Sequence, residues 1–365
     1  MNYGFTTGSC ATAAAKAAAY ALLGGIRLEK IKIMTPAGIE YEPKVEDVTV
    51  TSREAHCAVR KYSGDDPDVT NGTLIYASVS IIPDGKEEVI IDGGIGVGRV
   101  TRPGLDQPVG SSAINSVPRK MIKDEVRKVM REYDFEDSLS VIISVPEGEE
   151  LAGKTFNPRL GIEGGISIIG TSGIVEPMST KALIDTIRIE LKQIRAEGAK
   201  TAVISPGNYG FEFMRDNYGY DLDKAVKCSN HIGETLDMIV ELGFKSVLLT
   251  GHIGKLIKLS GGIMNTHSHE ADCRMELMAA AADRGGADMK TVRGILDSLS
   301  TEEAYQIMQD EGTDEAAMKY VMERIRFYMD ARTGGRIQTE CIVYANKWGL
   351  LGKTPGAEEL LRPDV

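Results

Sequence analysis

The chain has 365 residues, of which 42% are hydrophobic and 26% charged, and its formal net charge is −11. This composition is typical of a globular enzyme with two domains, and the negative charge excludes whole-chain attraction to nucleic acid or an anionic membrane. The five cysteines, Cys10, Cys57, Cys228, Cys273 and Cys341, contain no C-x-x-C pair, which favours a reduced, cytoplasmic protein.

The N-terminal segment predicts a helix over residues 11–23, which are nearly all strong helix formers and are followed by two glycines. The side chains of this run are too small for the apolar core of a signal peptide or for a membrane span, so we expect the helix to lie inside the fold. Thr7 or Ser9 is the expected N-cap. Because free N–H groups at a helix start attract anions, Thr6, Thr7 and Ser9 are also candidate substrate ligands, with plain capping as the alternative.

The next segment predicts the strands of a mixed or antiparallel sheet. The expected strands are Ile31–Met34, Val48–Thr51, Ala58–Tyr62, Leu74–Ile82 and Val89–Asp92. Between two of them, SGDDPDVTNG (63–72) carries three aspartates that could hold magnesium or calcium. No EF-hand glutamate follows, and Asp-Pro and Asn-Gly are ordinary turn pairs, so we favour a turn over a metal site.

The stretch DGGIGVGRVTRPG (92–104) is rich in glycine and carries two arginines. It imitates a nucleotide-binding loop, but no helical pattern follows it directly, so the dinucleotide fingerprint fails. Gly96 and Gly98 would let the backbone approach a ligand, and Arg99 and Arg102 would bind carboxylates. The alternative is a glycine-rich hairpin with solvated arginines.

A helix is predicted from Ser116, because apolar residues from Met121 to Met130 repeat at helical spacing. Arg119 lies in its first turn, where the helix dipole disfavours a cation. A bound anion would explain this position, so Arg119 is also a candidate substrate ligand.

From Leu139 onward strands and helices alternate, which predicts a parallel, doubly wound, Rossmann-like α/β domain over 137–365 after an α+β domain over 1–136. The expected strands are 141–145, 166–169, 202–205 and 247–250, and the expected helices are 180–197 and 230–242. The last third is mainly helical, with helices over 302–309 and 314–328 and a final strand over 340–344.

Three of these strands end in loops of small or polar residues, over 170–177, 205–210 and 250–256. Because the carboxyl ends of parallel strands share one edge of a sheet, we expect the three loops to meet over one crevice. No P-loop pattern is present. The candidate cofactor-binding residues are Gly170, Thr171, Ser172, Gly173, Pro206, Gly207, Asn208, Tyr209, Gly251, Gly254 and Lys255.

Histidines gather in and after the third loop. His252, His267, His269 and Cys273 suggest zinc, but their spacing matches no recognised zinc motif, so we expect no metal site. His252 and His267 are candidate acid/base groups or ligand contacts, with capping and core roles as alternatives. Asn265 either contacts the substrate or caps the following helix.

The motifs resemble one known family. FTTGSCATAAAKAA, GDDPDVTNG, GGIGVGRVTRPGL, INSVPRKMI, SPGNYG, KCSNHIGETLD and VLLTGHIGKLIKLSGGIMNTHSHEAD occur in the order of the CbiD family of cobalt-precorrin-5B (C1)-methyltransferases, from the N-terminus to about Ala282. The resemblance implies methyl transfer from S-adenosylmethionine to C1 of cobalt-precorrin-5B, giving cobalt-precorrin-6A in anaerobic cobalamin biosynthesis. Cobalt would enter only as part of the substrate. No catalytic triad is expected, because the macrocycle carbon is itself the nucleophile.

The resemblance also suggests a division of roles. The methyl donor would bind the loops at 170–173, 206–209 and 251–255, and the anionic tetrapyrrole would lie between the domains. Residues expected to bind it are Thr6, Thr7, Ser9, Gly96, Gly98, Arg99, Arg102, Arg119, Arg159 and Asn265. Alternative functions are a nucleotide-dependent kinase or oxidoreductase, or a non-catalytic corrinoid-binding protein. We expect no nucleic-acid or membrane partner, and a homo-oligomer is possible.

Overall fold

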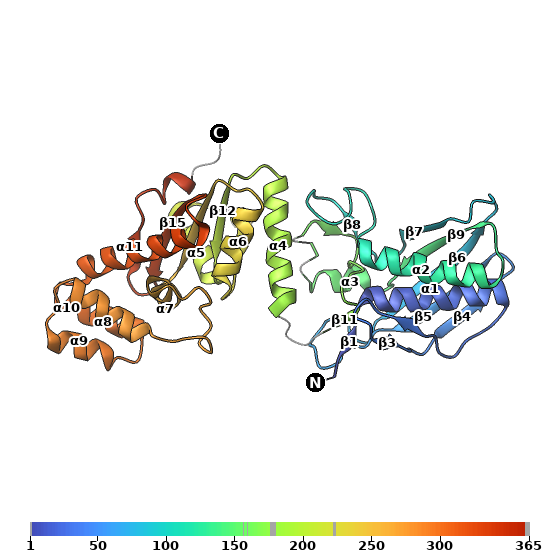
Figure 1. Cartoon of the computed structure of the whole chain (residues 1–365), viewed down its shortest axis with the longest axis horizontal. Helices are drawn as coiled ribbons and strands as arrows, with labels where there is room; N and C mark the ends of the chain where they lie inside the picture. Colours follow the sequence, from blue (N-terminus) through green and yellow to red (C-terminus); the bar gives the residue numbers. More distant parts are fainter. Residues whose placement is uncertain (1, 156, 159, 176–179, 222–223, 362–365) are drawn as a thin grey trace. The chain divides into compact units, whose positions relative to one another are not determined.

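The structure, a computed structural model, describes residues 2–155, 157–158, 160–175, 180–221 and 224–361. The chain divides into two compact units, Met1–Thr180 and Lys181–Val365. Both units combine helices and strands, which confirms the expected mixed α/β class (Figure 1). None of the helices in the described part of the chain has the length and apolar character that crossing a membrane requires.

The first unit is built on a five-stranded sheet with the order β4-β5-β6-β9-β7. β7 and β9 run parallel, and the other neighbours run antiparallel, so the prediction of a mixed sheet is confirmed. The strands are β4 (Glu46–Val50), β5 (Glu54–Arg60), β6 (Leu74–Ile82), β7 (Val89–Gly93) and β9 (Ser138–Ser144). Short antiparallel pairs are β1 (Gly4–Phe5) with β11 (Ile174–Val175), β2 (Ile33–Met34) with β3 (Glu40–Tyr41), and β8 (Arg99–Val100) with β10 (Ile162–Glu163).

Two long helices, α1 (Thr7–Gly24) and α2 (Ser116–Glu132), lie side by side against this sheet (Figure 1). A short helix, α3 (Gly148–Ala152), follows β9. α1 is buried along most of its length, and its buried face consists largely of alanine. Since a methyl side chain adds little bulk, the backbone of α1 can approach both α2 and the sheet closely. The Ala-rich run is therefore a core helix, as the sequence predicted.

The domain boundary differs from the one that the sequence predicted. The expected strand 141–145 was assigned to the second domain, but β9 pairs with both β6 and β7 inside the first sheet. Residues 166–169 form isolated bridges, Val97 with Ile166 and Ile114 with Ile168, and no strand of a parallel sheet. The parallel pair β7 and β9, joined through α2, has the same local pattern as the start of an α/β domain. The first unit therefore extends to residue 180 and not 136.

The second unit contains a sheet with the order β13-β12-β14-β15-β16, in which the first four strands are parallel and β16 is antiparallel. The strands are β12 (Thr201–Ser205), β13 (Ala225–Lys227), β14 (Ser246–His252), β15 (Gln338–Ala345) and β16 (Gly349–Lys353). The helices are α4 (Thr180–Ala196), α5 (Asn208–Tyr218), α6 (Ile232–Glu241), α7 (Ile253–Leu256), α8 (Arg274–Arg284), α9 (Met289–Leu296), α10 (Thr301–Asp310) and α11 (Asp314–Thr333), with 3-10 turns η2 (Ile257–Gly261) and η3 (Glu359–Leu361).

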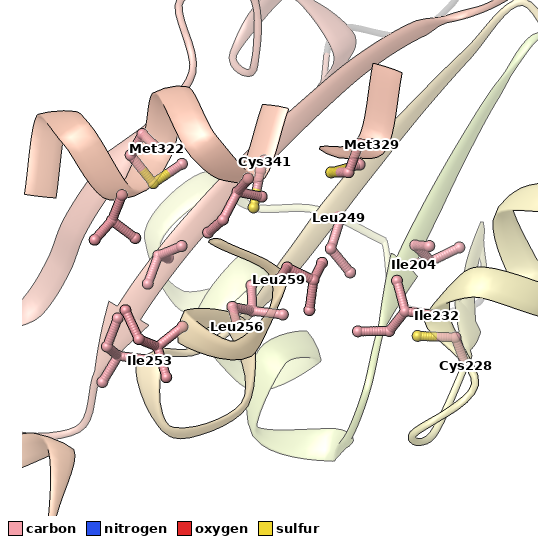
Figure 2. Packing of buried hydrophobic residues seen from close by; sticks show 14 of the residues in the cluster. Ile204, Cys228, Ile232, Leu249, Ile253, Leu256, Leu259, Met322, Met329 and Cys341 are labelled. Atoms are coloured by element: carbon pink, nitrogen blue, oxygen red, sulfur yellow. The ribbon is translucent and has the colours of Figure 1, made fainter. Parts of the chain in front are cut away.

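Side chains alternate between the two faces of this second sheet. Ile204, Leu249 and Cys341 contribute to the larger hydrophobic core, which also takes residues from α6, α7 and α11 (Figure 2). Their neighbours Val203 and Leu248 pack on the opposite face with residues of α5. Strands whose apolar residues pack on both faces are characteristic of a covered parallel sheet. The sequence did not predict α5, β13 or β16; the two strands are only three and five residues long, and α5 is bounded by Gly207 and Gly219.

Candidate functional site

Thr6, rather than Thr7 or Ser9, caps helix α1. Its Oγ1 accepts a hydrogen bond from the backbone N–H of Ser9 at 3.3 Å, and the N–H of Gly8 donates to the carbonyl of Ile169 at 2.9 Å. These N–H groups are thus used within the protein, which is the capping alternative that the sequence left open. The expectation that this helix start contacts substrate stays a prediction.

The hydroxyl groups of the same turn hold the segment 169–173. Ser9 Oγ donates to the carbonyl of Gly173 at 2.7 Å, and Thr7 Oγ1 accepts from the N–H of Ile169 at 2.9 Å. At Gly170, φ is +147° and a Cβ would lie 2.2 Å from Thr6 Oγ1. The loop of Gly170, Thr171, Ser172 and Gly173 therefore belongs to the first unit, and the expectation that it extends from the parallel sheet is wrong. Its role in donor binding stays a prediction.

The glycines of residues 93–98 bring backbone segments together. A Cβ at Gly96 would lie 1.7 Å from the carbonyl oxygen of Val145, and a Cβ at Gly98 would lie 2.8 Å from that of Gly165. Gly96 and Gly98 are both buried. The close approach that these glycines allow is therefore to other parts of the chain, and contact with a ligand stays a prediction.

The predicted arginines differ in what they contact. Arg99 forms a two-point ion pair with Asp92, with N–O distances of 3.0 and 3.1 Å. Arg119 donates to the carbonyls of Ile91, Ser112 and Ile114 and to Ser112 Oγ, so its position in the first turn of α2 needs no bound anion. Burial lowers the pKa of Arg119, and nearby Asp92 and Asp106 partly oppose this effect.

Arg102 is exposed, and its guanidinium makes no hydrogen bond or ion pair with the described residues. Gly161 packs against its aliphatic stem, since a Cβ there would lie 2.6 Å from Arg102 Cγ. The aliphatic part of the Arg102 side chain is thus held in place, and its guanidinium is available to a ligand. Arg159 lies outside the described residues.

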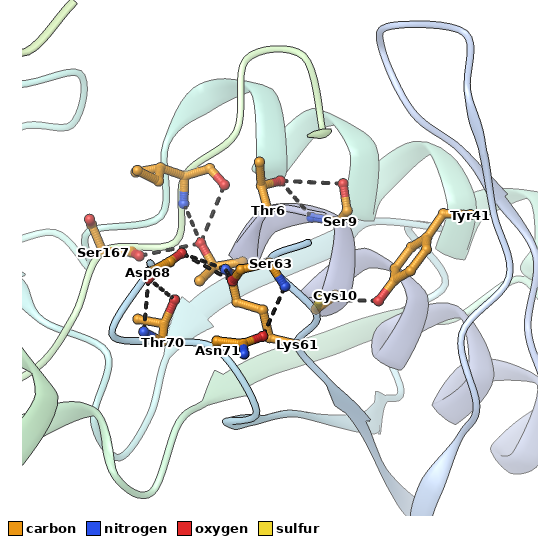
Figure 3. A network of polar contacts seen from close by, with 12 residues as sticks. Thr6, Ser9, Cys10, Tyr41, Lys61, Ser63, Asp68, Thr70, Asn71 and Ser167 are labelled. Carbon is orange, nitrogen blue, oxygen red and sulfur yellow. Dashed lines mark hydrogen bonds and ion pairs between the residues drawn. The ribbon is translucent and has the colours of Figure 1, made fainter. Parts of the chain in front are cut away.

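The aspartate-rich segment 63–72 is a polar network centred on a buried lysine (Figure 3). Lys61 Nζ donates to Ser63 Oγ at 2.5 Å and to Asp68 Oδ2 at 2.6 Å. The other oxygen of Asp68 accepts from the N–H and hydroxyl of Thr70. No group of three or more possible metal ligands occurs among the described residues. The segment is therefore held by its own ion pair and turns.

In the second unit, β12 and β14 end side by side and lead into two of the predicted loops. After β12, Pro206 is buried, Gly207 is the N-cap of α5 without a side-chain cap, and Asn208 and Tyr209 are exposed. After β14, a Cβ at Gly251 would lie 2.9 Å from Leu256 Cγ. The prediction that these two loops extend from one edge of a parallel sheet is confirmed.

His252 is the N-cap of α7, and both of its ring nitrogens are engaged. Nδ1 accepts from the N–H of Gly254 at 3.1 Å, so the ring proton is on Nε2, which lies 3.3 Å from Glu302 Oε1. Tyr344 packs edge-on against the ring at 5.7 Å. His252 therefore orients the turn that follows β14, and the capping alternative describes it better than a free base does.

The segment 262–273 carries the other candidates. His267 and His269 are exposed and pack edge to face, and His267 Nδ1 accepts from the N–H of His269 at 3.2 Å. Asn265 Oδ1 accepts from the N–H of His267 at 3.1 Å, so its visible role is to form this turn. Lys258, which is buried, donates to the carbonyls of Thr266 and Ala271 and so holds the segment in place.

Lys255 lies in α7 and is half-buried. Burial lowers its pKa, the nearby thiol of Cys228 opposes that effect, and Lys227 and Lys258 lower the pKa further. Its ammonium forms no hydrogen bond or ion pair within the described part of the chain. A half-buried ammonium without a protein partner is available to a ligand.

Sequence reasoning missed the contributions of Glu302 and Lys258. Glu302 is in the first turn of α10, 50 residues after His252, and no local pattern connects the two. Lys258 lies three residues after Lys255, and nothing in the local sequence indicates that it is only 3% exposed. Contacts between distant segments determine both roles.

Comparisons with known proteins agree with these motifs. The sequence profile described as CbiD matches residues 1–177, and that described as CbiD, C-terminal domain, matches residues 265–355. Relatives named cobalt-precorrin-5B C(1)-methyltransferase include one from Ruminiclostridium cellulolyticum, 45% identical over 95% of this chain and 89% of its own length. Another from Alkaliphilus metalliredigens is 45% identical over 99% of this chain and 94% of its own.

A crystal structure of a cobalamin biosynthesis protein (cbiD) from Archaeoglobus fulgidus is 32% identical and covers 74% of this chain and 84% of that one, with a TM-score of 0.40. The family assignment rests on the sequences. Since identity of 45% extends over nearly the full length of this chain and of its relatives, the chain belongs to the CbiD family.

Proposed function

We propose that this protein transfers a methyl group from S-adenosylmethionine to C1 of cobalt-precorrin-5B, giving cobalt-precorrin-6A in anaerobic cobalamin biosynthesis. The observation that carries this proposal is the 45% identity, over 95% of the chain, to a cobalt-precorrin-5B C(1)-methyltransferase. Methyl transfer to an electron-rich carbon needs alignment of donor and acceptor and exclusion of water more than it needs a nucleophilic side chain.

The methyl donor binds at the carboxyl edge of the second unit's sheet, in a Rossmann-like arrangement. Adjacent parallel strands β12 and β14 end there, and such edges are common ligand sites. The N-terminus of α5 has no side-chain cap, and the exposed ring of Tyr209 in its first turn offers a stacking surface for a nucleoside. Lys255 adds an available cation near the same edge.

Carboxylates of the tetrapyrrole bind to arginines of the first unit. Arg102 supports this role most strongly, because its guanidinium has no partner among the described residues. Arg99 contributes only if a ligand carboxylate competes with Asp92. Cobalt enters as part of the substrate.

Of the two histidine candidates, His267 is the more available to a ligand. His252 uses both ring nitrogens, for Gly254 and for Glu302. His267 is exposed; its Nδ1 accepts from the N–H of His269, so its Nε2 carries the ring proton and, without a partner among the described residues, can donate to the substrate. His252 instead keeps the turn that carries Lys255 in one conformation.

The test is to incubate the purified protein with cobalt-precorrin-5B and S-adenosylmethionine that carries a ¹³C methyl group. We expect a product with one labelled methyl group, located at C1 by NMR, and formation of S-adenosylhomocysteine. Binding of ATP or NAD in preference to S-adenosylmethionine would instead indicate a kinase or oxidoreductase. Tight retention of the unmodified corrinoid would indicate a carrier.

The same assay separates the two binding roles. Arg102→Ala should raise the KM for the tetrapyrrole about tenfold, the loss expected for one charge-assisted hydrogen bond, and leave the Kd for S-adenosylhomocysteine unchanged. Lys120→Ala, which removes an exposed cation paired with Asp124 on α2, is the matched control and should change neither. An unchanged KM in Arg102→Ala would remove this residue from the substrate site.

A further inference from the structure

Lys255 has an unusual environment for a cation. It is half-buried, and among the described residues its ammonium forms neither a hydrogen bond nor an ion pair. Withdrawing an ammonium from water without a partner is costly, so such groups usually have a protein counter-ion or a ligand. Among the described residues, Lys255 has no protein counter-ion.

Two other cations lie close enough to Lys255 to affect its charge. Lys227, the last residue of β13, and Lys258, in η2, both act on it electrostatically, as does the buried thiol of Cys228. Lys227 forms no ion pair with any residue that the structure describes, and Lys258 is bonded to two carbonyl oxygens. Asp272 compensates part of the charge of Lys258, and the three ammonium groups together still create a local positive potential in a protein whose net charge is −11.

The position of Lys255 is fixed by its neighbours on both sides. Ile253 and Leu256 are fully buried in the core of the second unit, where Figure 2 shows them close to Leu259. The His252 cap, itself bonded to Glu302, holds the N–H of Gly254. α7 therefore cannot rotate freely, and the ammonium is presented without further ordering cost to the backbone.

This lysine also lies at the edge of the sheet where ligands are expected. β14 leads directly into α7, and Cys228, which follows β13, donates its N–H to the carbonyl of Ser205 at the end of β12 at 2.9 Å. The parallel strands β12, β13 and β14 thus end beside the cluster of Lys227, Lys255 and Lys258.

We propose that Lys255 binds a carboxylate of a ligand at this edge and thereby determines which ligands are accepted. The proposal rests on the function proposed above, which supplies two sources of that group: the methionyl carboxylate of the methyl donor and the acidic side chains of the tetrapyrrole. The methionyl carboxylate is the source we favour, because the methyl donor is proposed to bind at this same edge of the sheet, and the test separates the two.

The test measures binding by isothermal titration calorimetry for the wild type, Lys255→Met, Lys255→Arg and the control Lys319→Met, an exposed lysine on α11. The probes are S-adenosylhomocysteine, 5′-methylthioadenosine, which lacks the carboxylate, and cobyrinic acid with its fully esterified form. Lys255→Met should weaken S-adenosylhomocysteine about 10- to 100-fold and leave 5′-methylthioadenosine unchanged. Lys255→Arg should restore most of the affinity.

Each outcome has a definite meaning. Weaker binding of cobyrinic acid alone, with its ester unaffected, would keep the carboxylate site and assign it to the tetrapyrrole. The proposal would be overturned if Lys255→Met bound S-adenosylhomocysteine and cobyrinic acid as tightly as the wild type does. It would also be overturned if the variant lost as much affinity for 5′-methylthioadenosine and the cobyrinic ester, which lack a free carboxylate, as for the two acids. If the wild type binds S-adenosylhomocysteine while Lys255→Met binds both it and cobyrinic acid as well as the wild type does, the proposed function stands and only this inference fails. Failure of the wild type to bind it would count against the donor, and the cobyrinic acid arm would still decide the role of Lys255.

The pH dependence gives a second readout that a purely structural role would not produce. The lysine must be charged to bind a carboxylate, and burial with two neighbouring lysines lowers its pKa in the free protein. Affinity for S-adenosylhomocysteine should therefore decline as pH rises through a range below that of an ordinary lysine, and Lys255→Arg should abolish this decline. Thermal unfolding midpoints of the variants establish that they are folded.

Discussion

At the scale of single residues, the ion pair between Lys61 and Asp68 determines the conformation of the aspartate-rich loop. Lys61 is 3% exposed and bonds to both Ser63 and Asp68. Burial by itself would raise the pKa of Asp68, but the charge of Lys61 and hydrogen bonds from Lys61 and Thr70 outweigh it, so the pKa lies below the ordinary 3.8. The folded state thus stabilises the ionised carboxylate.

We predict that Lys61→Met reduces the free energy of unfolding at pH 7 by about 2 to 3 kcal/mol, because it leaves a partly buried carboxylate without its partner. A carboxylate whose pKa is depressed by folding stabilises the native state above its unfolded pKa, and this contribution is lost as pH falls through the folded value. The difference between wild type and variant should therefore shrink below pH 3.8. Urea denaturation at several pH values measures it.

The control is Lys120→Met, which breaks an exposed ion pair with Asp124 on α2. Exposed pairs contribute little, so this variant should unfold at nearly the wild-type urea concentration. A loss of stability in Lys61→Met that is constant from pH 7 to pH 3 would show that the ion pair is not its source.

The sequence identified which residues were chemically notable better than it identified their partners. It singled out Arg119 by its unfavourable position in the helix dipole and inferred an anion, whereas the backbone carbonyls of Ile91, Ser112 and Ile114 accept its hydrogen bonds. It likewise singled out His252, but not Glu302, 50 residues later. Residue type and spacing show where charge is placed, and only the fold shows what neutralises it.

At the scale of elements, the glycines between β7 and β8 are required by contacts between loops. Gly96 has φ +70° and lies against Val145, whose carbonyl oxygen would be 1.7 Å from an added Cβ. A Cβ at Gly148 would likewise lie 2.1 Å from the carbonyl oxygen of Gly96. The sequence predicted a close backbone approach here, and the approach that the structure shows is to other segments of the chain.

We predict that Gly96→Ala destabilises the first unit by at least about 3 kcal/mol, because backbone atoms cannot move aside as a side chain can. Gly110→Ala is the matched control: its φ is +88°, but nothing lies within 4 Å of an added Cβ. That variant should lose only about 1 kcal/mol, the cost of the left-handed backbone conformation alone. Chemical denaturation of both variants measures the difference, and equal losses would exclude the close approach as the cause.

At the scale of the whole molecule, the sequence predicted the order and type of most elements and not their assignment to sheets. Periodicity identified α1, α2, α11 and the buried strands within a few residues of their bounds. β9 was assigned to the wrong domain because a strand that follows a helix has the same local pattern in either sheet. Strand pairing is a long-range property, so a single sequence carries little information about it.

The division at residue 180 makes a prediction about autonomous folding. The hydrophobic clusters of the first unit are built from residues between 5 and 168, and those of the second from residues between 184 and 361. We propose that each unit has the core it needs, since domains of this size bury enough apolar surface to fold alone. The fragments Met1–Thr180 and Lys181–Val365 should each unfold cooperatively on heating, followed by circular dichroism.

A third fragment makes the test specific. Met1–Glu136 ends at the boundary that the sequence predicted and lacks β9, which joins β6 to β7 in the sheet. Without β9, the buried faces of Ile75, Ala77 and Val79 on β6 lose their neighbouring strand, and an unpaired strand edge is exposed. This fragment should show no cooperative transition and should aggregate. A cooperative transition in Met1–Glu136 but not in Met1–Thr180 would mean that β9 belongs functionally to the second half of the chain, and the boundary at residue 180 would have to be abandoned.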